Sequence, residues 1–469
     1  MKLKKIELAI FTIIALVFVL IELNGITHIG PGDENVYYYM AKSVAEGQLP
    51  YKDFFYAHPP LHVLVLALII KIFGISMPML KSAELFALLA GAFFLYKTSL
   101  ELFKNRLNDN NHILVSALAL ILFLFSFEVM FKATFSMGIN LSLMLLLIAF
   151  YLLFTKNYFI GGVFSGLAGL ARFYALIPLL AFFAFILLEK YKEERLKDFL
   201  KVLTGFLLTF GLAISVLAII FGQNFIEPVF KYHLLKPKLP GQKVTVYKNV
   251  LFENIPIISS FLLSIFIKNR KKFALFYLAA ASYLAFLLLL STIFEFYFII
   301  LFPFMAIIGA FSFVDLTRRI KLQKLIKYAL IFFIAAIFFW STVADMLFLQ
   351  KIGFLDINPL GEMVGKISGT SKNQYLFGDD SIVPLLALLS NRKIALNFID
   401  SDEKRFTSGL ENFYLFTNQL DDVDLSYIIL RKNKGIHQIL EFREYAEQRC
   451  KLDRQYSDIT EGVFLFYKC

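Results

Sequence analysis

Long apolar runs separated by short charged segments fill the first three-quarters of the chain. The first run covers residues 8–23 and follows Lys2, Lys4 and Lys5. Ten further runs lie near residues 61–77, 82–102, 113–127, 139–155, 159–188, 199–221, 251–267, 273–292, 297–314 and 327–348. Most have the length of about 17–22 residues that a helix needs to cross a hydrocarbon core of roughly 30 Å. The pattern predicts an α-helical polytopic membrane protein.

The charges of the loops set the predicted orientation. The first run ends in Glu22-Leu23-Asn24-Gly25, without the small residues of a signal cleavage site, which favours an uncleaved span with the N-terminus inside. If residues 61–77 are re-entrant or interfacial and residues 159–188 are two short spans broken around Arg172, most Lys and Arg residues of the loops lie on the cytoplasmic side. We therefore predict about 11 spans in a multi-pass protein of the cell membrane, with a cytoplasmic N-terminus and an extracytoplasmic C-terminus.

The composition of the chain agrees with this interpretation. Of its 469 residues, 58% are hydrophobic and only 18% are charged. Soluble chains average about 45–50% apolar and about 25% charged residues, so a soluble globular protein is excluded. The net charge of +11 is concentrated before residue 349. In an apolar chain such clustered charge sets topology, and we expect no nucleic-acid partner.

The composition changes sharply after about residue 349. Short apolar runs at 375–377, 394–398, 427–430 and 463–467 predict strands, and residues 382–389 and 436–448 predict helices. We expect a transmembrane domain over residues 1–348, with a first outer loop at 25–81, and a small extracytoplasmic α/β domain over residues 349–469. Cys450 and Cys469, the two cysteines of the chain, could pair if this domain lies outside the cell.

The first outer loop carries the densest chemistry. It reads His28-Ile29-Gly30-Pro31-Gly32-Asp33-Glu34-Asn35 and then Tyr-rich sequence, which places two adjacent carboxylates close to the end of a span. A carboxylate in such a place can serve as a general base. The simpler interpretation is an acidic first turn of a loop helix, which the Gly-Asp-Glu-Asn sequence also fits.

The rest of the loop favours the catalytic interpretation. Residues 43–64 continue with Gly-Gln-Leu-Pro-Tyr-Lys-Asp and with Ala57-His58-Pro59-Pro60 at the start of an apolar run. The whole loop resembles the first outer loop of the GT-C class of membrane glycosyltransferases, above all the dolichyl-phosphate-mannose protein mannosyltransferases and the aminoarabinose transferases of lipid A. The resemblance is strongest over residues 1–100, looser to about 315 and absent in the tail.

The resemblance implies an inverting glycosyltransferase that moves a sugar from a polyprenyl-phosphate donor to a protein, lipid or glycan acceptor at the outer face. Asp33 would be the general base, with Glu34 beside it. Glu128, the carboxylate of the second outer loop, would support Asp33, although its spacing to Lys132 also permits a plain ion pair. Besides donor and acceptor, the expected partners are membrane lipids.

Positive charge is needed to hold the donor phosphate. The outer segment Lys231-Tyr232-His233-Leu234-Leu235-Lys236 is similar to a His-containing segment of the family, which implies that Lys231, His233 and Lys236 bind the donor. An equally weighted interpretation is that this loop binds anionic lipid headgroups. Arg172 lies deep in apolar sequence, where a charged residue is a functional-site hypothesis, with a snorkelling side chain as the alternative.

Two departures from the family pattern affect the remaining residues. The aminoarabinose transferases have Glu-Lys-Pro-Pro where this chain has Ala57-His58-Pro59-Pro60, which puts a metal at that position in doubt. His58 is then expected to contact the donor, and we expect no cofactor and no required divalent metal. Several relatives have a basic residue near Glu295, so that Glu295 and Tyr297 are predicted to contact substrate.

Two other function classes remain open. A transporter or flippase of lipid-linked sugars could use the same basic groove, but the chain shows no paired halves with broken helices. A structural membrane protein with a partner-binding tail would leave Arg172 and the acidic loop without a role.

Overall fold

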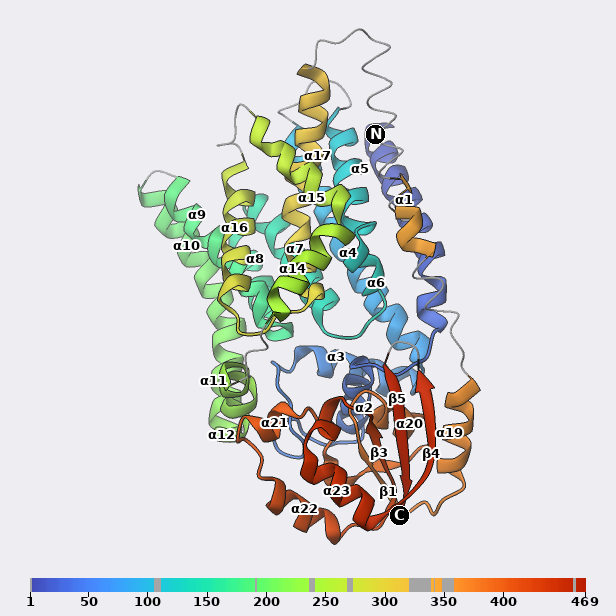
Figure 1. Cartoon of the computed structure of the whole chain (residues 1–469). Coiled ribbons are helices and arrows are strands. Elements are labelled where there is room, and N and C mark those ends of the chain that lie inside the picture. The colour runs from blue at the N-terminus through green and yellow to red at the C-terminus, as the bar shows by residue number, and fades with distance from the viewer. Residues whose placement is uncertain are drawn as a thin grey trace. The chain divides into compact units, whose positions relative to one another are not determined.

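The computed structural model describes residues 2–104, 111–189, 192–235, 241–267, 273–319, 339–340, 342–347, 358–458 and 461–469 (Figure 1). The chain forms two compact units. Unit 1 contains Met1–Ile26, Lys81–Ile214 and Leu239–Lys351, and unit 2 contains Thr27–Leu80, Ser215–Lys238 and Ile352–Cys469. The segment predicted to be the first outer loop thus folds together with the C-terminal tail.

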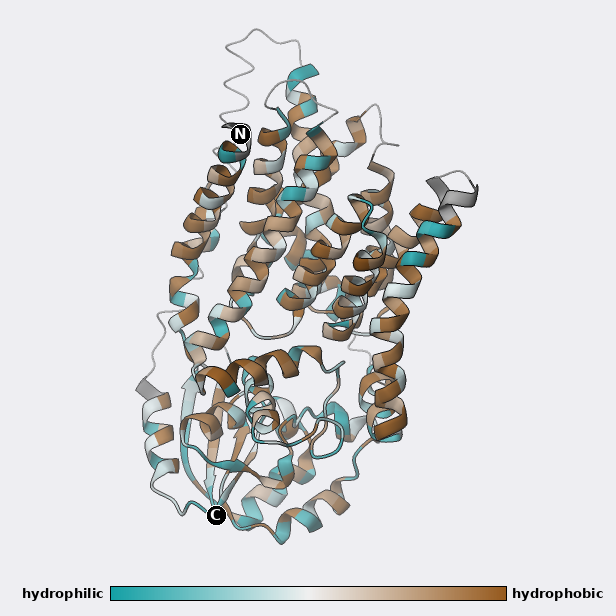
Figure 2. Ribbon diagram, turned by 180° about the vertical axis from the view of Figure 1, so that it is seen from behind, coloured by the Kyte–Doolittle hydropathy of each residue, from teal (hydrophilic) through white to brown (hydrophobic). Residues whose placement is uncertain are grey.

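Unit 1 is built from helices. It includes α1 (Lys2–Thr27, which ends at the unit boundary), α4 (Met77–Lys104), α5 (Asn111–Leu124), α6 (Phe127–Phe131), α7 (Ile139–Phe154), α8 (Tyr158–Ala171), α9 (Leu176–Glu189), α10 (Lys192–Phe206), α14 (Gln242–Glu253), α15 (Ile255–Leu262), α16 (Ala274–Leu289) and α17 (Phe302–Arg319). Short 3-10 or π segments connect several of them: η1 (Phe173–Ala175), η2 (Leu207–Gly211), η4 (Leu263–Phe266) and η6 (Glu295–Ile300). Figure 2 shows that hydrophobic residues dominate most of these helices.

Among the described residues, three helices are long and apolar enough to cross a membrane: Lys5–Thr27, Met77–Lys104 and Leu196–Phe221. The pair Gln242–Glu253 and Ile255–Phe266 passes the same test together but is bent by 87°. The other apolar helices are shorter, and the predicted span near 327–348 lies largely outside the described residues. The number of about 11 spans and their orientation therefore stay predictions.

One local prediction for unit 1 can be compared with the structure. The helix over 159–188 is interrupted at Arg172, where the backbone is extended between α8 and η1, as expected. Between the apolar runs 199–221 and 251–267 the described residues form α12 (Gln223–Ile226), η3 (Glu227–Lys231) and α13 (Tyr232–Leu235), which belong to unit 2, and α14 of unit 1.

Unit 2 combines two helices of the first outer loop with a mixed sheet. The loop helices are α2 (Glu34–Ala45) and α3 (Leu61–Phe73), and α11 (Leu212–Phe221) ends in this unit. The sheet has the strand order β2-β1-β3-β5-β4, in which β2 (Lys393–Ile394), β1 (Tyr375–Gly378) and β3 (Leu425–Arg431) are parallel and β5 (Gly462–Lys468) and β4 (Lys451–Asp458) are antiparallel. The tail helices are α19 (Asn358–Ser368), α20 (Val383–Leu389), α21 (Lys404–Thr407), α22 (Phe413–Asp421) and α23 (Leu440–Arg449).

The predicted strands at 375–377, 427–430 and 463–467 and the two predicted tail helices are present. The strand expected at 394–398 ends after Ile394, because Leu396 and Asn397 adopt positive φ angles and the chain turns there. Strand β4 was not predicted, since its exposed polar sequence has only one buried residue, Tyr456.

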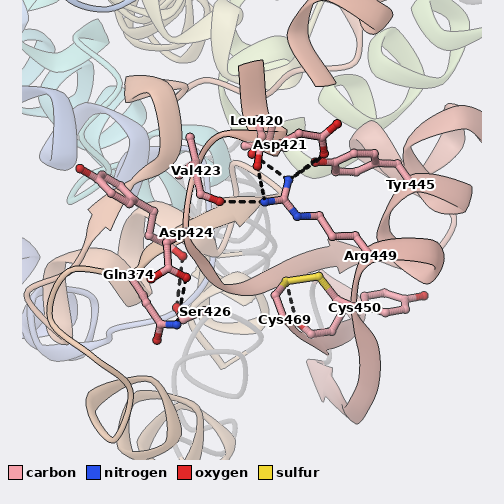
Figure 3. The surroundings of a disulfide bond; sticks show 12 residues. Gln374, Leu420, Asp421, Val423, Asp424, Ser426, Tyr445, Arg449, Cys450 and Cys469 are labelled. Atoms are coloured by element: carbon pink, nitrogen blue, oxygen red, sulfur yellow. Dashed lines mark hydrogen bonds and ion pairs between the residues drawn. A yellow bond between two sulfur atoms is a disulfide. The ribbon is translucent and has the colours of Figure 1, made fainter. Parts of the chain in front are cut away.

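A core of aromatic and aliphatic side chains lies under the sheet, with Phe377, Phe398, Phe416 and Phe442 at its centre. Cys450 and Cys469 form a disulfide that links the start of β4 to the end of the chain (Figure 3). Beside it, the Arg449 guanidinium donates to the backbone carbonyls of Leu420 and Val423, at 2.7 and 2.8 Å (Figure 3). These bonds fix α23 against the connection between α22 and β3.

Candidate functional site

Asp33 stands at the start of α2, in a loop that is held from both sides. The Asn35 side-chain amide donates to the carbonyls of Gly30 and Gly32, each at 3.0 Å. The amide of Gly32 donates to the carbonyl of Ser381 at 2.8 Å, so that the C-terminal tail fixes this loop. Asp33 itself is exposed. A fixed backbone with an accessible carboxylate is what a general base for an incoming acceptor requires.

Glu34 has a different environment from its neighbour. Its side chain is only 4% exposed, whereas that of Asp33 is open to solvent. Helix α2 packs against α20, which explains why Glu34 in its first turn is buried while Asp33 before it is exposed. Of the two predicted carboxylates, Asp33 is the one that a substrate can reach.

The tail brings further carboxylates into the neighbourhood of Asp33. Asp379 and Asp380 follow strand β1 directly, and Arg431 forms an ion pair with Asp379 at 3.3 Å. Burial raises the pKa of Asp379, and burial together with Asp379, Asp400 and Asp33 raises the pKa of Asp380 well above its usual range. This pair was not predicted, although an Asp-Asp dipeptide directly after a buried strand is a visible signal in the sequence.

The two histidines predicted to contact the donor lie together in unit 2. The rings of His58 and His233 have centroids 5.2 Å apart, and His233 Nε2 is 2.7 Å from the carbonyl oxygen of Ala57. The Tyr51 hydroxyl donates to the carbonyl of His58 at 2.6 Å and so holds the segment in place. The fold therefore brings together two histidines that are 175 positions apart in the chain.

The lysines of the same segment are placed differently. Lys231 forms an ion pair with Glu227 at 3.0 Å on an exposed turn. Lys236 lies outside the described residues. Between them, the Tyr232 hydroxyl donates to Asp402 at 2.7 Å, and burial with the nearby carboxylates raises the pKa of Tyr232.

Arg172 is buried in unit 1 at the interruption between α8 and α9. Its guanidinium is oriented by the backbone carbonyl of Met137, to which Nε donates at 2.6 Å and Nη2 also donates. The residue is 4% exposed and close enough to Tyr297 for an electrostatic interaction. A guanidinium is planar and carries five N–H donors, which suits it to bind a phosphate or a carboxylate.

Glu128 belongs to a cluster of carboxylates in the same unit. Glu253 and Glu295 are its charged neighbours, and burial first, then these two charges, raise the pKa of Glu128 to about 8. Glu295 accepts a hydrogen bond from Asn249 at 3.0 Å. The Lys132 ammonium lies over the rings of Phe131 and Phe135, 4.4 and 3.9 Å from their centroids. Glu253 was not among the predicted residues.

Three tyrosines of unit 1 are joined by hydrogen bonds. The Tyr174 hydroxyl donates to the Tyr297 hydroxyl at 3.1 Å, and the Tyr283 hydroxyl donates to the carbonyl of Tyr297 at 3.0 Å. Tyr297 is thus fixed at both its backbone and its side chain. Tyr174 and Tyr297 thus form a hydrogen-bonded pair, and Arg172 interacts electrostatically with Tyr297.

An apolar cavity of about 430 Å³ lies between α14, α15, α16 and α17. Its lining includes Tyr247, Phe261, Tyr277, Phe298 and Met305. A cavity of this volume is within the range of small-molecule sites, and its composition suits an acyl or prenyl chain. Among the described residues, no group of three or more His, Cys, Asp or Glu side chains is arranged to hold a metal ion.

Solved structures of similar shape are known at low sequence identity. ArnT from Cupriavidus metallidurans bound to undecaprenyl phosphate matches with a TM-score of 0.66 over 98% of this chain and 97% of ArnT, at 11% identity. The chain has a GT-C fold. The apo state of the same ArnT gives a TM-score of 0.65 at 12% identity, over 98% and 97% of the two chains.

An oligosaccharyltransferase of Archaeoglobus fulgidus, tethered to an acceptor peptide, shares this GT-C fold. Its TM-score is 0.54 at 13% identity, over 99% of this chain and 74% of that chain. No protein-family model matches the sequence, and no curated protein is significantly similar to it. The GT-C fold includes the C-terminal part of the chain, where the sequence alone gave no resemblance.

Proposed function

We propose that this protein is an inverting glycosyltransferase that transfers a sugar from a polyprenyl-phosphate donor to an acceptor at the outer membrane face. The observation that carries the proposal is the GT-C fold over nearly the whole chain, shared with an ArnT structure that holds undecaprenyl phosphate. The accessible Asp33 on a fixed loop is the local support. The acceptor is a protein, a lipid or a glycan.

The reaction needs one base and a cationic phosphate site. Asp33 takes the proton of the acceptor hydroxyl while the hydroxyl oxygen attacks the anomeric carbon from the face opposite to the phosphate. The bond between that carbon and the phosphate oxygen breaks, and polyprenyl phosphate leaves with the electron pair. Because phosphate is a good leaving group, no protein acid has to protonate it. A single displacement of this kind inverts the configuration of the sugar.

Arg172 is our main candidate for the phosphate site. Its guanidinium is buried and held by Met137, so it is oriented before the donor arrives. Tyr297 and Tyr174 can add hydroxyl donors beside it. His58 and His233 are the candidates on unit 2, and Lys231 and Lys236 remain in the proposal as surrounding charge.

The apolar cavity of unit 1 is our candidate for the start of the polyprenyl chain. It is lined by Phe261, Phe298 and Phe302 and has two tyrosines at its wall. The prenyl chain reaches the cavity from the bilayer, which is equally apolar, so the cavity would position the chain by close packing rather than by removing it from water.

The proposed topology places the C-terminal part outside the cell. The disulfide between Cys450 and Cys469 supports it, because such bonds persist in oxidising compartments. The N-terminus is then cytoplasmic if the number of spans is odd.

A transfer assay on the purified protein tests the function. The mixture contains a radiolabelled polyprenyl-phosphate sugar, a membrane extract as acceptor and EDTA. We expect label to move from carrier to acceptor with the wild type and to fall at least about 100-fold with Asp33→Asn, because the base is lost while the side-chain volume is kept. Asp53→Asn, a change of another aspartate in the same loop, is the matched control and should keep most of the activity.

Full activity of the Asp33→Asn variant would contradict the assignment of the base. A donor that binds but is never consumed, with metal restored and several sugars tried, would favour a flippase of lipid-linked sugars.

A further inference from the structure

A polar pocket of about 470 Å³ lies within unit 2, between helix α2 and the β2 edge of the sheet. Tyr39 and Lys42 on α2 form one wall together with Gln48 in the following turn. Lys393 on β2 and Asp424 before β3 are on the other wall. Its volume is within the range of small-molecule sites.

The walls of this pocket are fixed by buried hydrogen bonds. The Tyr39 hydroxyl accepts from the amide of Ile394 at 3.1 Å, which ties α2 to the edge strand. The Arg392 guanidinium next to it donates to the carbonyls of Ile367 and Ser368, at 3.2 and 3.1 Å. A pocket that is already ordered binds its ligand without the entropy cost of ordering the walls.

The rim of the pocket also contains strained backbone. Leu396 and Asn397, which both line it, have φ angles of 54° and 51°. Such angles are costly for residues other than glycine and cluster at functional sites. The two residues are the centre of a tight turn that is closed by a hydrogen bond from the Phe398 amide to the carbonyl of Ala395 at 2.9 Å.

The lining chemistry identifies the class of ligand. Charges of both signs face the pocket: Lys42 is paired with Glu46 at 3.0 Å, and Asp424 accepts from Gln374 at 3.2 Å (Figure 3). The side-chain oxygen of Gln48 is buried and has no hydrogen-bond partner within the described part of the chain. Two lysines face three carboxylates here, so a phosphate or another strong anion is not favoured.

A neutral ligand with many hydroxyl groups satisfies this lining best. Each hydroxyl both donates and accepts, and can therefore bridge a carboxylate, an amide and an ammonium group. Aromatic rings such as Tyr39 and Tyr375 supply apolar surface for the faces of sugar rings. The lining is too polar for a lipid chain.

We propose that this pocket binds a neutral saccharide segment of the acceptor, and thereby selects a glycan or glycolipid as acceptor. The inference rests on the proposed function. Helix α2 begins beside Asp33 and carries Lys42 nine positions later, so the pocket lies about 14 Å along the helix from the base. A segment held there presents a more distant hydroxyl group of the same acceptor to Asp33.

Saturation-transfer NMR on the full chain tests the binding. The probes are neutral tri- and tetrasaccharides, namely mannose, glucose and N-acetylglucosamine oligomers. The detergent must carry no sugar headgroup, since a maltoside would compete. We expect at least one probe to bind the wild type, and Gln48→Leu with Lys393→Ala to weaken that binding about tenfold. The matched control, Gln455→Leu with Lys451→Ala on the opposite edge strand β4, should bind like the wild type.

The outcomes separate this inference from the proposed function. Binding that Asp33→Asn leaves intact and the pocket variant loses would support the pocket. If no probe binds the wild type, or if binding survives in the pocket variant, the inference is wrong. Donor consumption by the wild type, and its loss in Asp33→Asn, decides the proposed function independently, because both chains keep the pocket unchanged.

Discussion

The carboxylate of Glu128 is buried beside Glu253 and Glu295, which makes its protonation a part of the stability of the protein. Burial and these charges raise its pKa from 4.5 to about 8 in the folded state. The folded state therefore holds a proton that the unfolded chain releases above about pH 4.5. The stabilisation is complete below that pH and is lost as the pH rises through about 8.

We predict that Glu128→Gln flattens this pH dependence. The thermal midpoint of the wild type should fall between pH 5 and pH 8, and the variant should lose much of that slope because its amide does not titrate. Thermal unfolding in detergent at several pH values measures the difference. Glu441→Gln, at an exposed position in α23, is the control and should follow the wild type. An unchanged slope in Glu128→Gln would contradict the raised pKa.

Single residues could be predicted from the sequence where the chemistry is local. Asp33 could be proposed because its neighbours in the chain form a recognisable loop, and its side chain is exposed in the structure. Glu253 and Asp380 could not be found in this way. Their significance comes from neighbours such as Glu128 and Asp33, which only the folded chain brings close.

Helices α8 and α10 approach each other so closely that glycine is required between them. A methyl group at Gly162 would overlap the backbone carbonyl of Val202, and one at Gly205 would overlap that of Phe159. The glycines within residues 158–171 indicate that some helix comes close, but they do not identify α10 as that helix.

We predict that Gly162→Ala destabilises unit 1 by about 1–3 kcal/mol, since the backbone of α10 has to move. Reversible unfolding in mixed detergent micelles gives the free energy of unfolding. The control is Gly211→Ala, where the added methyl group meets only the flexible side chain of Leu207. Equal stability of the two variants would show that the α8–α10 contact is looser than in the structure.

Elements with a clear apolar period were predicted well, and those stabilised mainly by their neighbours were not. Strand β3 has a buried run from Leu425 to Leu430 and was expected. Strand β4 has no such pattern, since it is an exposed edge that exists through its pairing with β5 and through the disulfide at Cys450.

For the molecule as a whole, the sequence predicted the class of fold, but not that the first outer loop and the tail form one compact unit. That association depends on contacts between Gly32 and Ser381 and between Tyr39 and Ile394, more than 340 positions apart in each case. It matters for function, because the tail then fixes the loop that carries Asp33. A tail that merely followed the last span would have no such role.

The disulfide offers a test of the topology on which the proposed function depends. If unit 2 lies outside the cell, Cys450 and Cys469 are oxidised in intact cells and react with a maleimide only after reduction.

Removal of the bond with Cys450→Ser should cost about 3 kcal/mol of stability, because it closes a loop with a sequence separation of 19. The freed Cys469 should then react with a membrane-impermeant maleimide. In a cysteine-free background, Lys197→Cys, on the predicted cytoplasmic side, should be protected from the same reagent.

Thiols that react in intact wild-type cells without reduction, or protection of the freed Cys469, would place unit 2 inside the cell. Asp33, which belongs to the same unit, could then not serve an acceptor at the outer face.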